Sequence, residues 1–542
     1  MVASPAHGLG VACSLDDLRE LDLDLRPRWV MWSPDTAAAL VGVGVRLSTC
    51  WDIAATHRLL HGGWQADPAR TWAAAHGLAT DSIPDRVAVD LFNQSSPDDR
   101  HIHLRDDRYL DPDFVAEGWY VDDRSLRLWA ELGVETALAQ RANLAALGPR
   151  ALATARSEST AELLCVELGV DGLPLDRGVA EALIAAIIGE RPTSDTHAAN
   201  IRRERDDTVL RHAETSARVD LRNPAHVKSL LRTVGVETPD TRAWRLEAVR
   251  DVHPLVDALL TWRKAERIAT TYGYAWLDGQ VGPGSRLRGH WTGCDGAAGR
   301  MTASNGLHNL PAQLRSAVVA EPGYVFVRAD LGQIEPRVLA AVSGDRALAA
   351  ATSNPDLYQP VADQLAVDRA TAKVAVLGAM YGQTTGHGAQ ALHRLRRAYP
   401  VAMDYLDAAD LAGQAGRDLR TYGGRLIRLG GSTAFEGSER DGRSRAAARG
   451  RYARNALVQG AAAEFFKVWA VIVRARGADL GARIVLCLHD ELLVHAPIGN
   501  GEAVAQLVDD SMSEAAYRWA PDRSVRFVAD IDVIERWSDV KG

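Results

Sequence analysis

The alternation of apolar and polar residues predicts short β-strands in the second half of the chain. Residues 324–330 form a run rich in Val and aromatic residues that ends at Asp330. Residues 483–490 form a second apolar run, and residues 491–495 follow it directly. Because Val, Ile and Leu flank a His-Asp-Glu sequence, these two runs predict a β-hairpin with a polar tip.

Helical spacing dominates the rest of the chain. Apolar residues recur at steps of three or four between residues 124 and 188, and residues 196–270 continue as charged amphipathic helices. Residues 368–381 predict a further helix between the strands. The pattern therefore predicts an α+β fold, with helices attached to an antiparallel sheet. A domain boundary is expected near residues 145–158, where a Gly-Pro pair precedes a polar stretch.

Composition excludes several classes of protein. The chain has 542 residues, 47% hydrophobic and 24% charged, which predicts a folded protein of roughly three or four globular units. Its five cysteines contain no Cys-x-x-Cys pair, so neither a disulfide scaffold nor a cysteine zinc cluster is expected. We find no secretion signal and no apolar run of about 18 residues. We expect a cytoplasmic, nucleoid-associated protein without a membrane partner.

The net charge of −8 does not decide the partner, because the charge is unevenly distributed. Residues 1–140 carry a balance of −10, whereas the remaining residues carry +2. Residues 417–454 hold ten arginines against four acids. Binding to DNA phosphates requires a cationic surface at the binding site and does not require a positive net charge of the whole chain. The net charge therefore does not exclude a nucleic-acid partner. We expect residues 417–454 to follow such phosphates.

Lysine is scarce, with five lysines against 57 arginines. A coding bias toward arginine explains most of this imbalance. Where arginine is the default cation, a retained lysine such as Lys373 is a candidate for proton donation, because a guanidinium does not release its proton near neutral pH.

Two groups of residues suggest chemistry. Asp330, Asp490 and Glu491 each stand at a strand end, and carboxylates from separate strands are how two divalent cations are held for phosphoryl transfer. Arg369 and Lys373 lie one helical turn apart, on the same predicted face as Leu377 and Tyr381. Cations beside an apolar and aromatic surface suit a nucleoside triphosphate. Taken singly, acids in turns and an ordinary amphipathic helix explain these residues as well.

The order of the motifs changes that balance. The sequence Asp-Leu-Gly-Gln-Ile-Glu-Pro-Arg at 330–337 resembles the first palm motif of family A DNA polymerases. Residues 369–382 resemble their fingers-helix motif, and Leu-His-Asp-Glu-Leu at 488–492 resembles their last palm motif. Three further segments also match in order: 262–272, 299–311 and 455–460. The resemblance extends from Ala161 to Trp537.

The resemblance implies a right-hand polymerase fold, with an antiparallel palm sheet, helical fingers and a helical thumb. It divides the chain into a degenerate 3′–5′ exonuclease-like domain at 1–145, thumb and start of the polymerase domain at 158–290, and palm and fingers at 291–542. The fingers are expected at about 345–425. The first domain is expected to be a small α/β remnant.

The resemblance also implies the catalytic residues and their metal ions. Asp330, Asp490 and the backbone carbonyl of Leu331 would bind two Mg²⁺ ions, for which Mn²⁺ can substitute, and Glu491 would assist. Lys373 would protonate the leaving pyrophosphate. The implied deoxynucleotide contacts are Arg369, Lys373, Tyr381, Glu335, Gln333, Leu377 and Tyr358. The implied DNA contacts are Arg300, Asn455, Gln459, Arg451, His489 and Arg337.

Within that set, Glu335 would be the steric gate against ribonucleotides, with Tyr381 behind it. The chain departs from the family pattern at several positions. Leu377 replaces a stacking aromatic residue, Leu331-Gly332 replaces an aromatic-Ser pair, and Tyr358 stands where a phosphate-binding His is common. These departures put nucleotide affinity and sugar discrimination in question.

The N-terminal part resembles only a fragment of an exonuclease domain. Residues 32–52 match the segment around one metal-binding acid, Asp35, but the partner acids are not found at the family's spacing. One carboxylate does not hold two metal ions, so we expect no proofreading, and no 5′-nuclease domain is found.

The sequence therefore predicts a monomeric template-directed DNA polymerase that acts on primer-template DNA and deoxynucleoside triphosphates, in repair or replication. A catalytically silent duplex-binding protein is one alternative, because the nucleotide pocket is altered. A 3′–5′ exonuclease is the other.

Overall fold

The computed structural model describes residues 2–4, 9–11, 14–86, 103–213, 219–282, 284–382, 389–430, 442–488 and 490–539. The chain forms two compact units. Unit 1 consists of Met1–Asp171, His290–Ala303 and Gly323–Val533, and unit 2 of Gly172–Gly289, Ser304–Pro322 and Ile534–Gly542.

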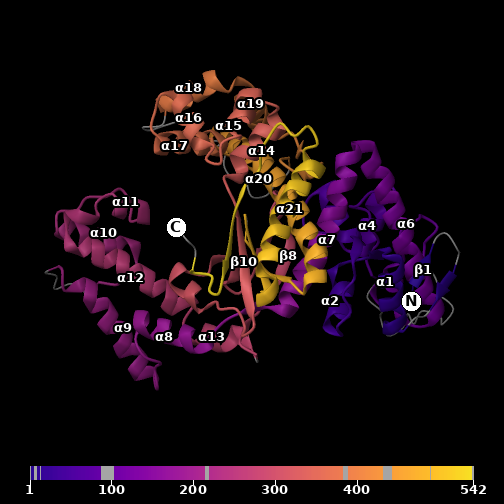
Figure 1. The fold of residues 1–542 in the computed structure, drawn as a ribbon, viewed down its shortest axis with the longest axis horizontal. Coiled ribbons are helices and arrows are strands. Elements are labelled where there is room, and N and C mark those ends of the chain that lie inside the picture. The colour runs from indigo at the N-terminus through magenta and orange to yellow at the C-terminus, as the bar shows by residue number, and fades with distance from the viewer. Residues whose placement is uncertain are drawn as a thin grey trace. The chain divides into compact units, whose positions relative to one another are not determined.

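A four-stranded sheet lies at the centre of unit 1 (Figure 1), in the order β13-β14-β10-β15. Its strands are β13 (Arg483–Leu488), β14 (Glu491–Pro497), β10 (Tyr324–Leu331) and β15 (Ala529–Ile534). β14 pairs antiparallel with both β13 and β10. The predicted strands and the predicted hairpin are thus confirmed.

Buried and partly exposed residues alternate near the end of β10, which shows which side chains share a face of the sheet. Val325, Val327 and Ala329 are buried, whereas Arg328 and Asp330 are only partly covered. Residues two apart in a strand point to the same face, so Arg328 and Asp330 share one face of the sheet. The smaller hairpin of β8 (Trp291–Asp295) and β9 (Arg300–Ala303) also belongs to unit 1.

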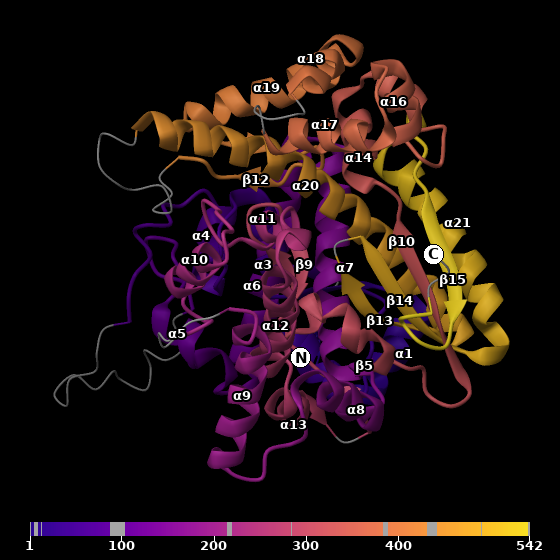
Figure 2. The same ribbon diagram turned by 90° about the vertical axis from the view of Figure 1, so that its left-hand side faces the viewer.

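Three long helices pack around this sheet. They are α20 (Gly442–Gly477), α21 (Gly501–Trp519) and α7 (Pro149–Asp171). Figure 2 shows α7 beside β13 and β14, with α20 next to it. By length and composition alone α20 is apolar enough to cross a membrane, but most of its apolar window is buried within the protein. Its apolar residues thus serve the packing of the core.

A group of helices follows β10 in the chain, and all of them after α14 lie in the segment where the fingers are expected. They are α14 (Ile334–Ser343), α15 (Arg346–Ala351), α16 (Tyr358–Leu365), α17 (Arg369–Tyr381), α18 (Ala389–Ala398) and α19 (Pro400–Gln414). The strands β11 (Leu419–Arg420) and β12 (Leu426–Ile427) then form a short antiparallel pair. The helix predicted at 368–381 is confirmed as α17, with Asp368 as its N-cap.

The N-terminal part of unit 1 is a small α/β arrangement around a parallel pair of strands. β3 (Arg28–Met31) and β4 (Thr49–Asp52) pair in parallel, and α2 (Pro34–Gly42) connects them. The other elements are β1 (Val2–Ser4), β2 (Leu9–Val11), α1 (Leu15–Leu25), α3 (Ile53–His61), α4 (Pro68–Ala75), α5 (Pro112–Ala116), η2 (Gly118–Tyr120) and α6 (Asp123–Leu147). One of its apolar cores includes Trp51, Ile53 and Leu144.

Unit 2 is mostly helical. Its helices are α8 (Arg177–Ile188), α9 (Asp195–Leu210), α10 (Pro224–Thr233), α11 (Ala243–Glu247), η3 (Arg250–Val252), α12 (Pro254–Thr271), α13 (Tyr274–Gln280), η4 (Leu307–Asn309) and η5 (Ala312–Ala317). The strands β5 (Leu173–Pro174), β7 (Arg286–Leu287) and β6 (Val281–Gly282) form a small sheet. Leu230, Leu259 and Trp262 lie in its apolar core.

The two units divide the chain differently from the three predicted segments. α6 ends at Leu147, and Gly148, with a φ of +105°, allows the turn into α7. This turn lies within the predicted boundary region. However, the segment predicted to begin at residue 158 would begin inside α7, and all of α7 belongs to unit 1.

Candidate active site

Three carboxylates meet at one end of the central sheet. Asp330, near the end of β10, stands directly opposite Glu491, the first residue of β14. Asp490 precedes β14, and its carbonyl accepts a hydrogen bond from the Leu331 amide at 2.8 Å. The sheet register therefore fixes three acids from distant parts of the sequence side by side.

Arg328 is the cation that holds this cluster together. Its Nε donates to Glu491 at 2.5 Å, and its Nη2 donates to Asp330 at 2.7 Å. Burial raises the pKa of Asp490 to about 6, and the charges of Asp330 and Glu491 add to that effect. Burial also raises the pKa of Asp330, although Arg328 opposes it. Arg328 thus bonds two of the three carboxylates, and the cluster carries excess negative charge.

The donor chemistry of this cluster fits a divalent cation. Carboxylate oxygens are the ligands that Mg²⁺ prefers, and the excess negative charge is what a bound cation would neutralise. As the side chains lie, Arg328 occupies oxygens of Asp330 and Glu491. Within the described part of the chain, no three or more His, Cys, Asp or Glu side chains already form a metal-binding group.

The predicted face of α17 is the less buried one. Arg369, Lys373 and Tyr381 are exposed and Leu377 is half-buried, whereas residues such as Ala372 on the other face are buried. The spacing of four residues thus produces a cationic and partly aromatic surface, as the sequence predicted.

Arg369 is held in place by an acid that the sequence reading did not single out. Its Nε lies 2.5 Å from Asp356 Oδ2, and Asp356 Oδ1 also accepts a hydrogen bond from Gln333 at 3.1 Å. The Gln333 side-chain oxygen accepts from the Leu357 amide at 2.7 Å. Gln333 therefore connects the end of β10 to the loop before α16, and both polar ends of its side chain have partners within the protein.

Tyr358 lies beneath Arg369. Its side chain is buried, and the guanidinium of Arg369 stands 5.7 Å from the centre of its ring. Burial raises the pKa of the Tyr358 hydroxyl to about 12. The residue supports the Arg369 side chain, and it presents little surface of its own to a ligand.

Three predicted residues from three motifs gather around Glu335. The Tyr381 hydroxyl donates to Glu335 Oε2 at 3.0 Å. Arg300 Nη2 lies 3.9 Å from Glu335 Oε1, and a hydrogen bond with Gln459 lowers the pKa of Tyr381 against the larger, opposite effect of burial. Glu335 therefore occupies the centre of a polar cluster between α14, α17 and α20.

The remaining predicted DNA contacts of α20 lie along one stripe. Arg451, Asn455 and Gln459 follow at steps of four and are exposed or half-buried, while the residues between them are mostly buried. Arg451 packs on Gly382, where an added Cβ would lie 2.7 Å from its side chain. Gly382, with a φ of +68°, ends α17 and allows this contact.

Arg337 does not have the position expected of a DNA contact. It is fully buried, and its guanidinium donates to the carbonyl oxygens of Gly332, Thr352, Asn354, Pro355 and Arg526. Five backbone acceptors use the whole fork of donors, so none remains for a phosphate. The expectation for Arg337 is therefore corrected: this residue ties together loops of unit 1.

The arginine-rich stretch 417–454 is also not uniformly a phosphate surface. Arg425 is buried in an ion pair with Glu158, and Arg454 is buried and bonded to Asp407 at 3.1 Å. Residues 431–441 of this stretch lie outside the described residues.

His489, the predicted primer-terminus contact, also lies outside the described residues.

The profile of DNA polymerase family A matches residues 217–539, which is more than half of the chain. This chain belongs to DNA polymerase family A. The matched region includes β10, α17 and the β13–β14 hairpin, so the three acids and the cationic helix belong to the family's region of the chain. Membership in this family implies dependence on a divalent metal ion in general.

The curated relatives are bacterial DNA polymerases. DNA polymerase I of Chloroflexus aurantiacus is 33% identical over 327 residues, which is 54% of this chain and 33% of that protein. The thermostable DNA polymerase I of Thermus caldophilus is 31% identical over 352 residues, which is 60% of this chain and 40% of that protein. The chain thus covers between a third and two fifths of these relatives.

A solved structure shows the same fold. The polymerase domain of Pol1 from M. smegmatis, in complex with DNA primer-template and dNTP, superposes with a TM-score of 0.69 at 22% identity. The match covers 96% of this chain and 88% of that domain. The α+β fold of this family A chain is therefore of the right-hand polymerase type, as the sequence predicted.

Two residues of the site were missed by sequence reasoning. Arg328 could have been found from strand alternation, because it stands two residues before Asp330 on the same face. Asp356 carries no such signal, since it reads as a polar loop residue in a Ser-Asn-Pro-Asp sequence. Only the folded chain brings it to Arg369.

In the N-terminal part, Asp35 is exposed at the start of α2, and its carboxylate accepts a hydrogen bond from Ser33 at 2.9 Å. The buried Asp22 accepts hydrogen bonds from Trp29 and Ser48. Both acids are therefore engaged in local structure.

Proposed function

We propose that this chain is a template-directed DNA polymerase that adds deoxynucleotides to a primer 3′-hydroxyl. The observation that carries the proposal is the sheet register: Asp330 faces Glu491 across β10 and β14, and Asp490 is bonded to Leu331. Family membership and the polymerase I relatives support it.

The acid cluster would hold two Mg²⁺ ions. Asp330, Asp490 and the backbone carbonyl of Leu331 are the ligands, and Glu491 balances Arg328 beside them. Such ions activate the primer hydroxyl and neutralise charge at the α-phosphate of the nucleotide. Arg328 would loosen its contact with Asp330 when a cation takes its place, since both compete for the same oxygens.

The exposed face of α17 would bind the triphosphate. Arg369, oriented by Asp356, offers its remaining donors to phosphate oxygens, and Lys373 follows it one turn along α17. We assign to Lys373 the proton that the leaving pyrophosphate takes up, because an ammonium can give a proton that a guanidinium retains.

The cluster around Glu335 would check the sugar and the new base pair. Tyr381 fixes the Glu335 carboxylate by its hydrogen bond, which positions that side chain as the gate against a 2′-hydroxyl. Arg300, Asn455 and Gln459 would contact minor-groove acceptors, which correct base pairs present in similar positions. Selection would thus depend on shape rather than on sequence.

The partners follow from the same reasoning. The polymerase domain with a matching fold was solved with DNA primer-template and dNTP, and we propose the same classes of partner for this chain, acting as a monomer. We place it in DNA repair or replication.

Primer extension tests the proposal. Purified protein with Mg²⁺, a primed template and four deoxynucleotides should extend the primer. Asp330→Ala and Asp490→Ala should each reduce extension by about a thousandfold or more, because removal of an outer-shell partner of a metal already costs about 10- to 100-fold. Single-turnover extension on a labelled primer measures this loss.

Asp509→Asn is the control, since Asp509 is an exposed acid of α21 away from the cluster. It should extend at the rate of the unaltered protein. Without nucleotides the primer should keep its full length, as expected for a chain without proofreading. Extension that survives in either alanine variant would remove that acid from the proposed metal site. Extension that never occurs with Mg²⁺ or Mn²⁺ would leave a silent duplex-binding protein as the better description.

The gate has its own test. Glu335→Ala should increase the use of ribonucleotides relative to deoxynucleotides by about tenfold or more, because it removes the side chain that would meet the 2′-hydroxyl and frees Tyr381. Single-nucleotide incorporation with deoxy-, dideoxy- and ribonucleotides measures the ratio. An unchanged ratio would remove Glu335 from this role.

A further inference from the structure

Unit 1 contains a group of arginines that is separate from the acid cluster and from the cationic face of α17. A hollow of about 360 Å³ lies between α7, α20 and α21, and Arg28, Arg150, Arg156 and Arg518 line it. No acidic residue and no residue of the proposed polymerase site is among its lining residues.

These arginines are poorly neutralised by the protein. Arg518 is paired with Glu514 at 2.5 Å. Arg28, Arg150 and Arg156 have no carboxylate partner among the described residues, and Arg28 donates only to the carbonyl of Cys50 at 3.0 Å. Burial, with the neighbouring charge of Arg156, lowers the pKa of Arg28. Like charges held together in this way favour an anion between them.

Aromatic residues give the hollow a rigid side. Arg150 lies over the ring of Tyr422, 4.0 Å from its centre, and Tyr422 in turn packs on Trp519 with ring centres 4.8 Å apart. Trp519 is only 5% exposed, and its indole N–H has no hydrogen-bond acceptor within the described structure. A buried donor without an acceptor is costly, and the residue that carries this one also lines the hollow.

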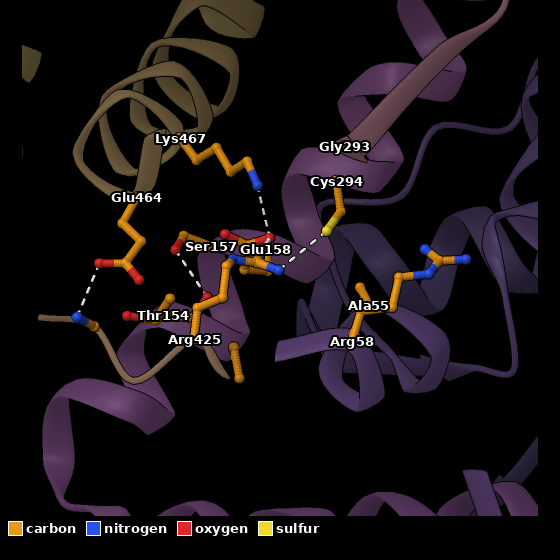
Figure 3. A network of polar contacts seen from close by, with 12 residues as sticks. Ala55, Arg58, Thr154, Ser157, Glu158, Gly293, Cys294, Arg425, Glu464 and Lys467 are labelled. Atoms are coloured by element: carbon orange, nitrogen blue, oxygen red, sulfur yellow. Dashed lines mark hydrogen bonds and ion pairs between the residues drawn. The ribbon is translucent and has the colours of Figure 1, made fainter. Parts of the chain in front are cut away.

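Two hydroxyl groups of α7 that line the hollow already donate within their own helix. Ser157 and Thr160 donate to the carbonyls of Thr154 and Arg156 within their own helix. Figure 3 shows Thr154 and Ser157 on α7, next to the buried ion pairs of that helix. The charged hydrogen-bond donors that line the hollow are the guanidinium groups.

We propose that this hollow binds ligands through their phosphate groups. Four guanidinium groups favour an anion with several charges, and their planar forks match phosphate oxygens in pairs. A volume of about 360 Å³ is at the lower end of ligand pockets. The phosphates belong either to a free polyphosphate, as in a nucleotide, or to a single DNA strand, and the experiment below separates these sources.

The test measures binding without metal or primer, so its result does not depend on whether the chain is a polymerase. All proteins carry Arg369→Ala and Lys373→Ala, which removes phosphate binding at the proposed nucleotide site. Inorganic tripolyphosphate and a fluorescent oligo-dT without a terminal phosphate are titrated separately in EDTA. Calorimetry measures the first and fluorescence anisotropy the second.

Arg150→Ala with Arg156→Ala should weaken binding of at least one probe by about tenfold or more for each guanidinium removed. Arg124→Ala with Arg127→Ala is the matched control, because it removes the same charge from exposed positions of α6. The control should bind as before. Loss of tripolyphosphate binding identifies a free polyphosphate site, and loss of oligo-dT binding alone identifies a strand site.

Arg156→Ala alone guards against misfolding, since the Arg156 guanidinium makes no hydrogen bond or ion pair within the described residues. It should show about tenfold weaker binding with an unchanged circular dichroism spectrum. Equal binding by the double variant and its control, or tighter binding of citrate than of tripolyphosphate, would overturn the proposal.

Discussion

Unit 1 contains two clusters of charged residues that differ in their balance of positive and negative charge. Where β10 ends and β14 begins, three carboxylates share one arginine, and two of them, Asp330 and Asp490, remain partly open to solvent. Between α7, β12 and α20, two glutamates face one lysine and one arginine, and all four are at most 2% exposed (Figure 3). The first cluster has excess charge, and the second is balanced.

The balanced cluster is built around Glu158. Its carboxylate lies 2.7 Å from Lys467 and is also paired with Arg425, whose guanidinium reaches Cys294 Sγ at 3.0 Å. Burial would raise the pKa of Glu158, but the charges of Arg425 and Lys467 outweigh it and lower that pKa. Here, then, the charged form is the stable one.

The acid cluster shows the reverse, because burial and like charges raise the pKa of Asp490. Repulsion among carboxylates that a sheet holds side by side favours the binding of a cation. This contrast distinguishes two kinds of buried charged group in this chain. Ion pairs completed within the fold stabilise it, and clusters left incomplete point to a ligand.

Removal of Glu158 should cause the largest loss of stability. Glu158→Gln leaves Lys467 and Arg425 as buried, uncompensated cations, and we expect a loss of about 3–5 kcal/mol in the free energy of unfolding. Lys467→Met leaves the Arg425–Glu158 pair intact and should cost on the order of 1 kcal/mol. Urea unfolding monitored by circular dichroism measures both.

Glu502→Gln, at an exposed position of α21, is the matched control and should stay within about 0.5 kcal/mol of the unaltered protein. If Lys467→Met proves more damaging than Glu158→Gln, the balance described here is wrong.

The two clusters also differ in whether their residues could be predicted from the sequence. Asp330, Asp490 and Glu491 were found because they end apolar strands, and the hairpin register then brings them together. Glu158 gave no such signal. It lies in a polar Arg-Ser-Glu-Ser-Thr run that reads as a boundary, yet the fold buries it, because α7 packs against α20 and the sheet. Tertiary packing, not local pattern, decides such a position.

Arg337 shows the same limit within a motif. Its place in the 330–337 sequence suggested a DNA contact, and the resemblance correctly located the motif on β10 and α14. Its side chain instead turns inward to the carbonyls of distant loops such as that at Asn354. A motif predicted the backbone position well, but the direction of one long side chain depended on residues up to 189 positions away.

The second glutamate of the balanced cluster should give a pH dependence. Burial raises the pKa of Glu464 to about 7, against hydrogen bonds from Thr421 and the Gly423 amide and the charge of Arg425, while Glu158 reinforces it. The folded protein thus binds more protons than the unfolded chain between about pH 5 and pH 7. Stability from this residue is present at low pH and is lost as the pH rises through about 7.

Glu464→Gln removes that dependence. The unfolding free energy of the variant relative to the unaltered protein should rise by up to about 3 kcal/mol between pH 5 and pH 8. Contributions from other groups cancel in this difference. Parallel pH profiles of the two proteins in urea unfolding would show that Glu464 does not titrate in this range.

The smallest expected effect is the one that tests the acid cluster as an incomplete site. Asp490→Asn should leave stability in EDTA unchanged or raise it by less than about 1 kcal/mol, because it relieves repulsion from Asp330 and Glu491.

Addition of Mg²⁺ should then stabilise the unaltered protein more than the variant, since a cation that binds only the folded state shifts the unfolding equilibrium. Thermal unfolding with and without Mg²⁺ measures both, and Asp509→Asn should respond like the unaltered protein. A variant that is clearly less stable in EDTA would place Asp490 among the structural charges, and the distinction between the two clusters would fail at its most important residue.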